Sequence, residues 1–176
     1  NYVVVECRAC ERPTLTLPFP PGGHRAHDPD GLLTAFDRHH RHRLSLMDDG
    51  VCPECSAPAN AHVEYHDAET DEGAENADHR RPQVQFDCER CGCRLRSPVT
   101  LAVLEHPAVI SFYHRHGIDI RERPVWNVGE EWREAVVSED PWCVRVSTAV
   151  NGDVLSLFVA SNLEVVTVRE TGQTAS

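Results

Sequence analysis

The chain has 176 residues, enough for one ordinary domain or two small ones, and 28 acidic against 17 basic residues give it a formal net charge of −11. This acidity argues against a surface that binds nucleic-acid phosphates, because such surfaces carry net positive charge. No apolar run approaches the ~20 residues needed to cross a bilayer, and no apolar signal segment is present. We therefore expect a cytoplasmic protein with no membrane partner.

All 17 basic residues are arginine, and lysine does not occur in the chain. Lysine is normally among the commonest residues, so its absence is a genuine bias. A dense carboxylate surface with arginine in place of lysine is typical of extreme halophiles, because carboxylates keep a protein hydrated while salt screens their repulsion. We therefore expect a halophilic protein.

One long helix is expected over residues 30–48, with Asp28 or Asp30 as its N-terminal cap and Gly50 closing it. A run of arginine and histidine at residues 38–43 lies on this helix. The run favours a solvated face with one or two packed histidines, although an anion-binding patch or a histidine metal site would use the same residues. The helical spacing is carried by Leu32, Leu33, Phe36, His40, Leu44 and Met47.

Extended segments surround this helix. The three prolines within residues 18–23 exclude a helix or a central strand, since proline lacks an N–H donor and fixes φ, so a linker or packed extended segment is expected. Residues 67–81 are polar and cannot bury enough apolar area to order themselves, which predicts a mobile hairpin loop. Alternating apolar residues predict strands over residues 2–6, 14–17, 61–66 and 82–88.

After residue 98 the pattern changes to short helices followed by strands. Residues 99–104 predict a short buried helix and residues 107–116 a second one. Residues 118–123 alternate and predict an extended segment, and a loop is expected between Trp126 and Trp132. A three-stranded antiparallel meander is predicted over residues 142–150, 153–160 and 163–169, with Asn151-Gly152 as its first turn.

Six of the eight cysteines form three Cys-x-x-Cys pairs, a spacing that favours metal binding over a disulfide framework. Two of the pairs flank a predicted hairpin, which is the arrangement of a zinc ribbon: two turns brought together by paired strands. Gly92 follows the second of these pairs, where the backbone has to turn. Four thiolates complete a tetrahedral site without an open position for catalysis, so we predict one structural zinc ion bound by Cys52, Cys55, Cys88 and Cys91.

The third pair, Cys7 and Cys10, has no partner pair in the sequence and is a candidate second metal half-site. It could recruit Cys93, His24 or His27, it could consist of two free thiols, or it could belong to a second ribbon. We favour the second ribbon, with its first knuckle upstream of this chain, because a strand entering Cys7 is how the second knuckle of a ribbon begins.

These elements predict an α+β fold: a zinc-ribbon β-hairpin module, then a small domain of short helices and a C-terminal antiparallel β-meander. Aromatic residues between the helices and the meander could line a small-molecule pocket, but more often form the core of such a domain: Phe112, Tyr113, Trp126, Trp132 and Trp142. The expected segments are an N-terminal knuckle with a proline-rich stretch (1–29), a helix (30–50), the zinc ribbon with its loop (51–97) and the α+β domain (98–176).

Seven blocks of the sequence carry a resemblance to a known family. They are residues 3–10 (Val-Val-Val-Glu-Cys-Arg-Ala-Cys), 17–23 (Leu-Pro-Phe-Pro-Pro-Gly-Gly), 33–38 (Leu-Thr-Ala-Phe-Asp-Arg), 49–55 (Asp-Gly-Val-Cys-Pro-Glu-Cys), 104–109 (Leu-Glu-His-Pro-Ala-Val), 116–119 (His-Gly-Ile-Asp) and 140–142 (Asp-Pro-Trp). Together they resemble the C-terminal region of haloarchaeal winged helix-turn-helix transcriptional regulators, often labelled ArsR-like. The resemblance covers nearly the whole chain.

The resemblance implies an N-terminal winged helix that binds DNA, followed by a Cys-x-x-Cys-rich region, and this chain matches only the second part. We therefore expect a non-catalytic accessory region for an effector, dimerisation or protein interaction, which reaches DNA only through a winged-helix domain missing from this chain. The partners implied are a second copy of the chain or a small-molecule or metal effector. The family commonly carries a further Cys-x-x-Cys pair just upstream of the first pair here, so its absence supports truncation.

Two other functions remain open. A thiol-based metal or redox sensor would use Cys7, Cys10 and Cys93, because an unpaired Cys-x-x-Cys near a ribbon could exchange thiols or bind a soft metal reversibly. An enzyme is less favoured, and no enzymatic activity is expected, since the candidate acid–base groups form no spaced catalytic motif: Glu105, His106, His114, His116, Glu122 and Asp140.

Overall fold

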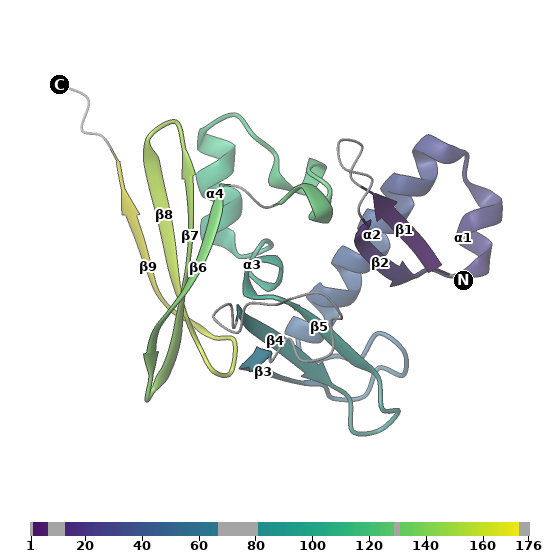
Figure 1. Ribbon diagram of the computed structural model, residues 1–176, viewed down its shortest axis with the longest axis horizontal. Helices are drawn as coiled ribbons and strands as arrows, with labels where there is room; N and C mark the ends of the chain where they lie inside the picture. The colour runs from purple at the N-terminus through teal and green to yellow at the C-terminus, as the bar shows by residue number, and fades with distance from the viewer. Residues whose placement is uncertain (1, 7–12, 67–80, 129–130, 173–176) are drawn as a thin grey trace.

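The computed structural model describes residues 2–6, 13–66, 81–128 and 131–172, and these form three antiparallel sheets joined by helices (Figure 1). The first sheet pairs β1 (Tyr2–Glu6) with β2 (Pro13–Pro18); the second has the order β3 (Asn60–His66), β4 (Arg81–Asp87), β5 (Arg94–Pro98); the third has the order β6 (Trp132–Glu139), β7 (Trp142–Val150), β8 (Asp153–Ala160), β9 (Val165–Thr171). The predicted α+β class, with a cysteine-bearing hairpin module and a C-terminal meander, is confirmed.

Helices connect these sheets. They are α1 (Pro21–Ala26), α2 (Pro29–Asp48), α3 (Val99–Ala102), α4 (Pro107–Arg115) and the 3₁₀ turns η1 (Ile120–Glu122) and η2 (Val125–Asn127). Among the described helices, none has the length and apolar character needed to cross a membrane. Figure 1 places the β6–β9 meander and the β1–β2 sheet on opposite sides of the molecule, with α2 running from the N-terminal side toward the β3–β5 sheet.

The N-terminal region differs from expectation at one element. Strands β1 and β2 pair as predicted, with Val3 opposite Leu17. The prolines that follow were expected to exclude a helix, yet α1 begins at Pro21 directly after Pro20 as its N-cap. Proline is tolerated in the first helical turn because the N–H it lacks has no acceptor within the helix there. The prediction of a linker or extended segment was therefore wrong for residues 21–23.

Helix α2 follows its prediction closely. Its cap is Asp28, whose Oδ1 accepts a hydrogen bond of 2.7 Å from the backbone N–H of Gly31. The apolar spacing buries Phe36 fully on one part of the helix and Met47 near its end. Phe36 joins a small N-terminal cluster with Val3 and Phe19, whereas Met47 joins the main core. One helix thus passes through two hydrophobic clusters.

The middle sheet contains the predicted hairpin and one additional strand. Strands β3 and β4 pair antiparallel, with Val63 opposite Val84, and so form the predicted hairpin. Strand β5 was not predicted, because only Leu95 among its residues is strongly apolar; it pairs with β4 opposite Phe86. Of the loop predicted over residues 67–81, residues 67–80 lie outside the described ranges, and Arg81 begins β4.

The C-terminal half has two short helices as predicted, but it departs from expectation twice. Residues 118–123 were expected to be extended, and instead contain η1, whose first turn is capped by Asp119: its Oδ1 accepts a 3.0 Å hydrogen bond from the N–H of Arg121. The meander has four strands rather than three, because β6 adds to β7 with Trp132 opposite Thr148. The predicted turn at Asn151-Gly152 is present, with φ of 53° and 92°.

The main core joins the middle sheet, α3, α4 and the meander into one packed body. Phe86, Phe112 and Tyr113 are fully buried at its centre. Tyr113 also satisfies its hydroxyl, which lies 2.7 Å from Oγ1 of Thr148 on β7. Burial of each such large apolar side chain contributes about 1.5–3 kcal/mol, so this shared core stabilises the packing of the middle sheet against the meander.

Candidate metal centre and neighbouring cleft

Two loops with the same hydrogen-bond pattern bring four cysteines together. In the first loop the N–H of Ser56 donates to the Cys52 carbonyl at 2.9 Å, and the Cys52 N–H donates to the Ala57 carbonyl at 2.9 Å. In the second loop Gly92 donates to Cys88, and Cys88 donates to the Cys93 carbonyl, again at 2.9 Å each. Each loop therefore closes a tight turn around its two cysteines, as a zinc knuckle requires.

Both turns place the residue after the second cysteine in the left-handed region. Gly92 has φ of 71° and Ser56 has φ of 58°. Glycine adopts this conformation without steric cost, whereas a serine there is uncommon. Glycine at position 92 therefore indicated a turn in the sequence, whereas serine at position 56 did not, although the two loops have the same hydrogen-bond pattern.

The four thiols form a compact cluster: the Sγ atoms of Cys52, Cys55, Cys88 and Cys91 all lie within 4.8 Å of one another. Two of the sulfur–sulfur distances are 3.6 Å, for Cys52 and Cys91, and 3.7 Å, for Cys55 and Cys88. A tetrahedron with Zn–S bonds of about 2.3 Å has edges of about 3.8 Å. The cluster thus has the dimensions of a four-thiolate metal site, and it could hold a metal ion.

The protonation of the cluster also favours a cation. Burial raises the pKa of the Cys52 thiol, but the backbone N–H groups of Glu54 and Cys55 and the neighbouring thiols lower it to about 6. The backbone N–H of Cys93 lowers the pKa of Cys91, yet the neighbouring thiols and burial raise it to about 12. The hydrogen bonds between the thiols thus move their pKa values in opposite directions: a thiolate that accepts such a bond is stabilised, and a thiol that donates one keeps its proton. A divalent cation bound by the four sulfurs would displace the remaining protons.

Arg43 of α2 lies beside the cluster and was not recognised from the sequence. Its Nη1 forms an ion pair with Glu54, which lies within the first knuckle. Its Nη2 lies 3.9 Å from Sγ of Cys93, which is close to the four-thiol set but not part of it. The guanidinium therefore offsets some of the negative charge that four thiolates would carry, and fastens the end of α2 to the first knuckle.

The candidate second half-site cannot be placed in the same way, because Cys7 and Cys10 lie outside the described residues. Of the partners considered for it, Cys93 sits beside the ribbon site. His27 is exposed, and His24 is partly buried against Phe19 with a ring distance of 5.6 Å. The pairing of Cys7 and Cys10 stays a prediction.

A family model described as "Domain of unknown function (DUF7351)" matches residues 1–165. The chain belongs to the DUF7351 family. No curated protein and no solved structure matches it. The family model supplies no activity, so the expected relation of this DUF7351 chain to ArsR-like regulators stays a prediction.

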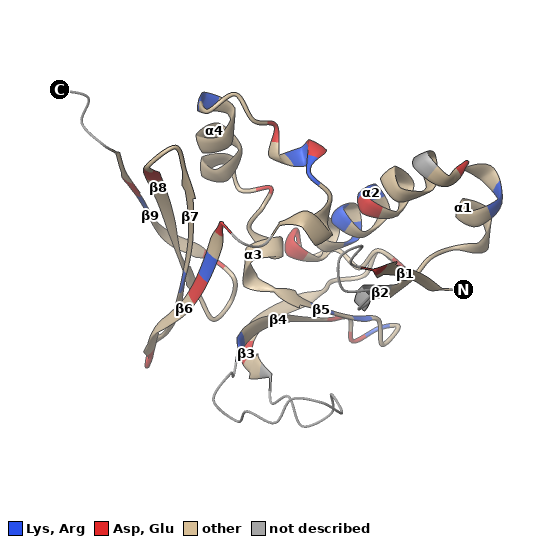
Figure 2. Ribbon diagram, turned by 45° about the horizontal axis from the view of Figure 1, so that its top comes forward, with Lys and Arg blue, Asp and Glu red and all other residues tan. Residues whose placement is uncertain are grey.

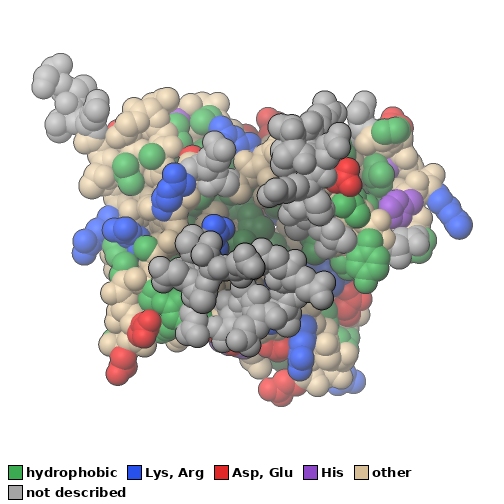
Figure 3. Space-filling model, in the orientation of Figure 1, with side chains coloured by type: hydrophobic (Ala, Val, Ile, Leu, Met, Phe, Trp, Pro, Cys, Tyr) green, Lys and Arg blue, Asp and Glu red, His purple; other side chains and the backbone are tan. Residues whose placement is uncertain are grey.

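Apart from the metal centre, the DUF7351 fold contains a large cleft. It has a volume of about 1100 Å³ and is bordered by residues of β2, α2, β3, β4, β5, α3, η2 and β6. Figure 3 shows hydrophobic side chains at the bottom of a hollow near the middle of one face. Of the aromatics considered from the sequence, Trp126 and Trp132 line this cleft, while Phe112 and Tyr113 belong to the core, and Trp142 packs on Tyr65 with rings 4.8 Å apart.

A buried ionic network fixes one wall of the cleft. Asp37 of α2 accepts a 2.7 Å hydrogen bond from the N–H of Val125. Arg41, one turn later, donates to the carbonyl of Arg123 at 2.7 Å and to Glu105 at 3.1 Å, and its Nε lies 3.6 Å from Asp37. Asp37 and Arg41 are both buried. The network holds the segment carrying η2 against α2, and so positions Trp126.

His40 lies on the same part of α2 and is almost fully buried. Its ring contacts Phe36 at 4.6 Å between centroids, and Phe36 contacts Trp126 at 5.7 Å. Burial, together with the charges of His39 and Arg43, lowers the pKa of His40 to about 4. His40 is therefore neutral near pH 7. This confirms the expectation of a packed histidine in the 38–43 run, whereas the burial of Arg41 was not foreseen.

Proposed function

We propose that this DUF7351 chain is the zinc-stabilised, non-catalytic accessory region of a haloarchaeal transcriptional regulator whose DNA contacts are made by a separate winged-helix domain. The observation that carries the proposal is the closed cluster of four thiols within 4.8 Å of one another. Zinc suits this donor set because four thiolates fill its tetrahedral shell. A filled shell leaves no position for water or substrate, so the ion would support folding rather than catalysis.

The distribution of charge supports a DNA-binding role for the separate winged-helix domain and not for this chain. The chain carries a net charge of −11, and Figure 2 shows acidic and basic residues interspersed along elements such as α2 and β6. A DNA-binding face gathers cations in one place, since affinity depends on neutralised phosphates. The seven blocks that resemble the region following a winged helix agree with this arrangement.

The experiment compares the chain alone with the same chain joined to its winged-helix domain. Zinc per chain is measured by mass spectrometry under native conditions, and binding to operator DNA by fluorescence anisotropy at several salt concentrations. We expect zinc bound at the four-thiol site and specific DNA binding only by the two-domain protein. Specific binding by the chain alone, with a steep dependence on salt, would contradict the proposal.

The metal part of the proposal has its own controls. Cys52→Ser removes one predicted ligand, whereas Cys143→Ser changes a cysteine of β7 that is far from the cluster in sequence and belongs to the third sheet. We expect the first variant to lose zinc and the second to keep it. Equal zinc contents in both variants would show that the four-thiol cluster is not the zinc site.

A thiol-based sensor is a second candidate, favoured by the position of Cys93 beside the cluster and Arg43. In that case Cys93→Ser in the two-domain protein abolishes the response of DNA binding to metal or oxidant. An unchanged response in that variant, and in one lacking Cys7 and Cys10, eliminates the sensor.

A further inference from the structure

The cleft between α2, the β4–β5 strands and β6 is independent of the metal centre and has the character of a ligand site. Its volume of about 1100 Å³ matches the upper range of pockets that hold small organic molecules. Its floor is largely apolar, with Leu101, Val125 and Trp126 among its lining residues. Mostly apolar walls with a few polar groups at fixed places are the usual composition of such sites.

The cleft is electropositive in a strongly acidic protein. Among the described residues that line it, three are arginines, Arg81, Arg96 and Arg133, and one is a carboxylate, Glu134. Oε1 of Glu134 is already engaged: it accepts hydrogen bonds from the N–H and the Oγ1 of Thr100, at 2.7 and 2.6 Å. Since the whole chain carries −11, this local excess of cations favours an anion over a neutral or cationic ligand.

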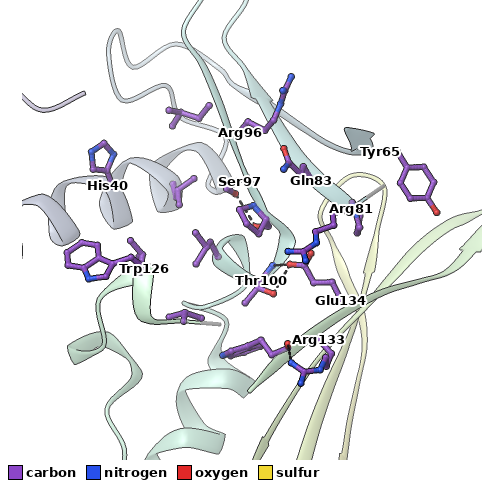
Figure 4. A pocket seen from close by; sticks show the side chains of 18 of the residues that line it. His40, Tyr65, Arg81, Gln83, Arg96, Ser97, Thr100, Trp126, Arg133 and Glu134 are labelled. Atoms are coloured by element: carbon purple, nitrogen blue, oxygen red, sulfur yellow. Dashed lines mark hydrogen bonds between the residues drawn. The ribbon is translucent and has the colours of Figure 1, made fainter. Parts of the chain in front are cut away.

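Arg81 is the cation best placed to bind that anion. It begins β4, and Figure 4 shows its side chain reaching toward Thr100 and Glu134 inside the cleft. Among the described residues, no carboxylate pairs with Arg81. By contrast, Arg96 donates to Gln85 at 3.1 Å and Arg133 to the carbonyl of Trp132 at 2.8 Å. The planar fork of an arginine binds a carboxylate through two parallel hydrogen bonds.

The α2 side of the cleft presents a buried polar atom without a partner. His40 is 7% exposed, and its Nε2 makes no hydrogen bond in the structure. Buried polar groups are nearly always paired, so an unpaired imidazole nitrogen in a cleft wall points to a group that completes it. Trp126 lies on the same side in Figure 4 and offers an aromatic surface next to it.

We propose that this cleft binds an organic anion with a flat apolar body, such as an aromatic carboxylate. The carboxylate pairs with Arg81, the body packs against Leu101, Val125 and Trp126, and a polar substituent on the far end hydrogen-bonds to Nε2 of His40. This anion would be the effector of the regulator. Only that regulatory role rests on the proposed function, because the binding itself can be measured on this chain alone.

The test uses 2-naphthoate as the probe and isothermal titration calorimetry as the assay. The uncharged 2-naphthamide, of nearly the same shape, tests the need for negative charge. Arg81→Gln removes the anchoring cation, and Arg90→Gln is its matched control, because Arg90 is an exposed arginine of the second knuckle and does not line the cleft. Zinc content and thermal midpoint are recorded for each variant to show that it is folded.

We expect one 2-naphthoate per chain, with affinity at least about 10-fold higher than for the amide and reduced about 10-fold or more by Arg81→Gln, since a charge-assisted pair is lost. Arg90→Gln should bind like the unmodified chain. Absence of binding at millimolar probe, equal binding of the amide, or equal losses in both arginine variants would each overturn the proposal. Binding with normal zinc content but without regulation of DNA binding would leave the cleft proposal standing and refute the proposed function.

Discussion

Removal of the metal is expected to destabilise the whole middle of the protein rather than one loop. The four-thiol cluster joins Cys52 to Cys91 and so closes a loop of roughly 40 residues. By the loop-closure relation used for covalent cross-links, such a closure is worth about 4 kcal/mol. A chain of this size loses roughly 2–4 °C of melting temperature per kcal/mol, so the expected loss is on the order of 8–16 °C.

The assay is thermal unfolding followed by circular dichroism, at constant salt, with and without a zinc chelator. Cys52→Ser should reproduce the effect of the chelator, and the chelator should have no further effect on that variant. Cys93→Ser should retain the metal and melt like the unmodified chain, because Cys93 lies outside the four-thiol set. A chain shown by mass spectrometry to be metal-free, yet with an unchanged melting temperature, would refute the reasoning.

Three further predictions concern α2. Arg41→Met leaves the buried Asp37 without its cation and should lower the free energy of unfolding, measured in urea, by about 3–5 kcal/mol. The double variant with Asp37→Asn should recover part of that loss. If the effects of the two substitutions simply add, the network does not exist as described. Phe36→Ala leaves a cavity at a fully buried site and should lower the free energy of unfolding, measured in the same way, by about 3–5 kcal/mol. The pKa of His40 is lowered to about 4 in the folded protein, so as the pH falls the unfolded chain binds a proton at this residue before the folded chain does. The folded protein therefore has roughly 3 kcal/mol of stability above about pH 6.5 that it loses as the pH falls toward 4. His40→Gln should therefore flatten the pH dependence of unfolding between pH 7.5 and 4.5, and equal slopes in both proteins would contradict this.

The elements that the sequence revealed are those whose signals are local. Helix α2 was readable because its apolar residues recur at helical spacing and Asp28 provides a cap. The hairpin of β3 and β4 was readable because its residues alternate, and the four cysteines because Cys-x-x-Cys turns have a fixed chemistry. In each case a few neighbouring residues are enough to specify the conformation.

The elements that were missed depend on tertiary contacts. Strand β6 mixes Arg133 and Glu134 with valines, and its pairing with β7 is stabilised by the burial of Trp132 against Tyr113, far away in sequence. Strand β5 is an edge strand whose polar residues can face solvent on one side, so its alternation is weak. The make-up of the cleft could not be predicted either, because its walls come from eight separate elements.

The same helix accounts for the position of both candidate sites. At its C-terminal end Arg43 pairs with Glu54 of the first knuckle, and one turn earlier His40 forms part of the cleft wall. Between them Arg41 holds the segment that carries Trp126. Residues 38–43 read in sequence as a charged surface run, but on a helix with 3.6 residues per turn they point in different directions. His40, Arg41 and Arg43 therefore each meet a different part of the protein, whereas Arg38 and His42 are exposed. The composition of residues 38–43 suggested a solvated face. Their helical arrangement explains why the segment instead contributes to the metal centre, the cleft and the packing between them.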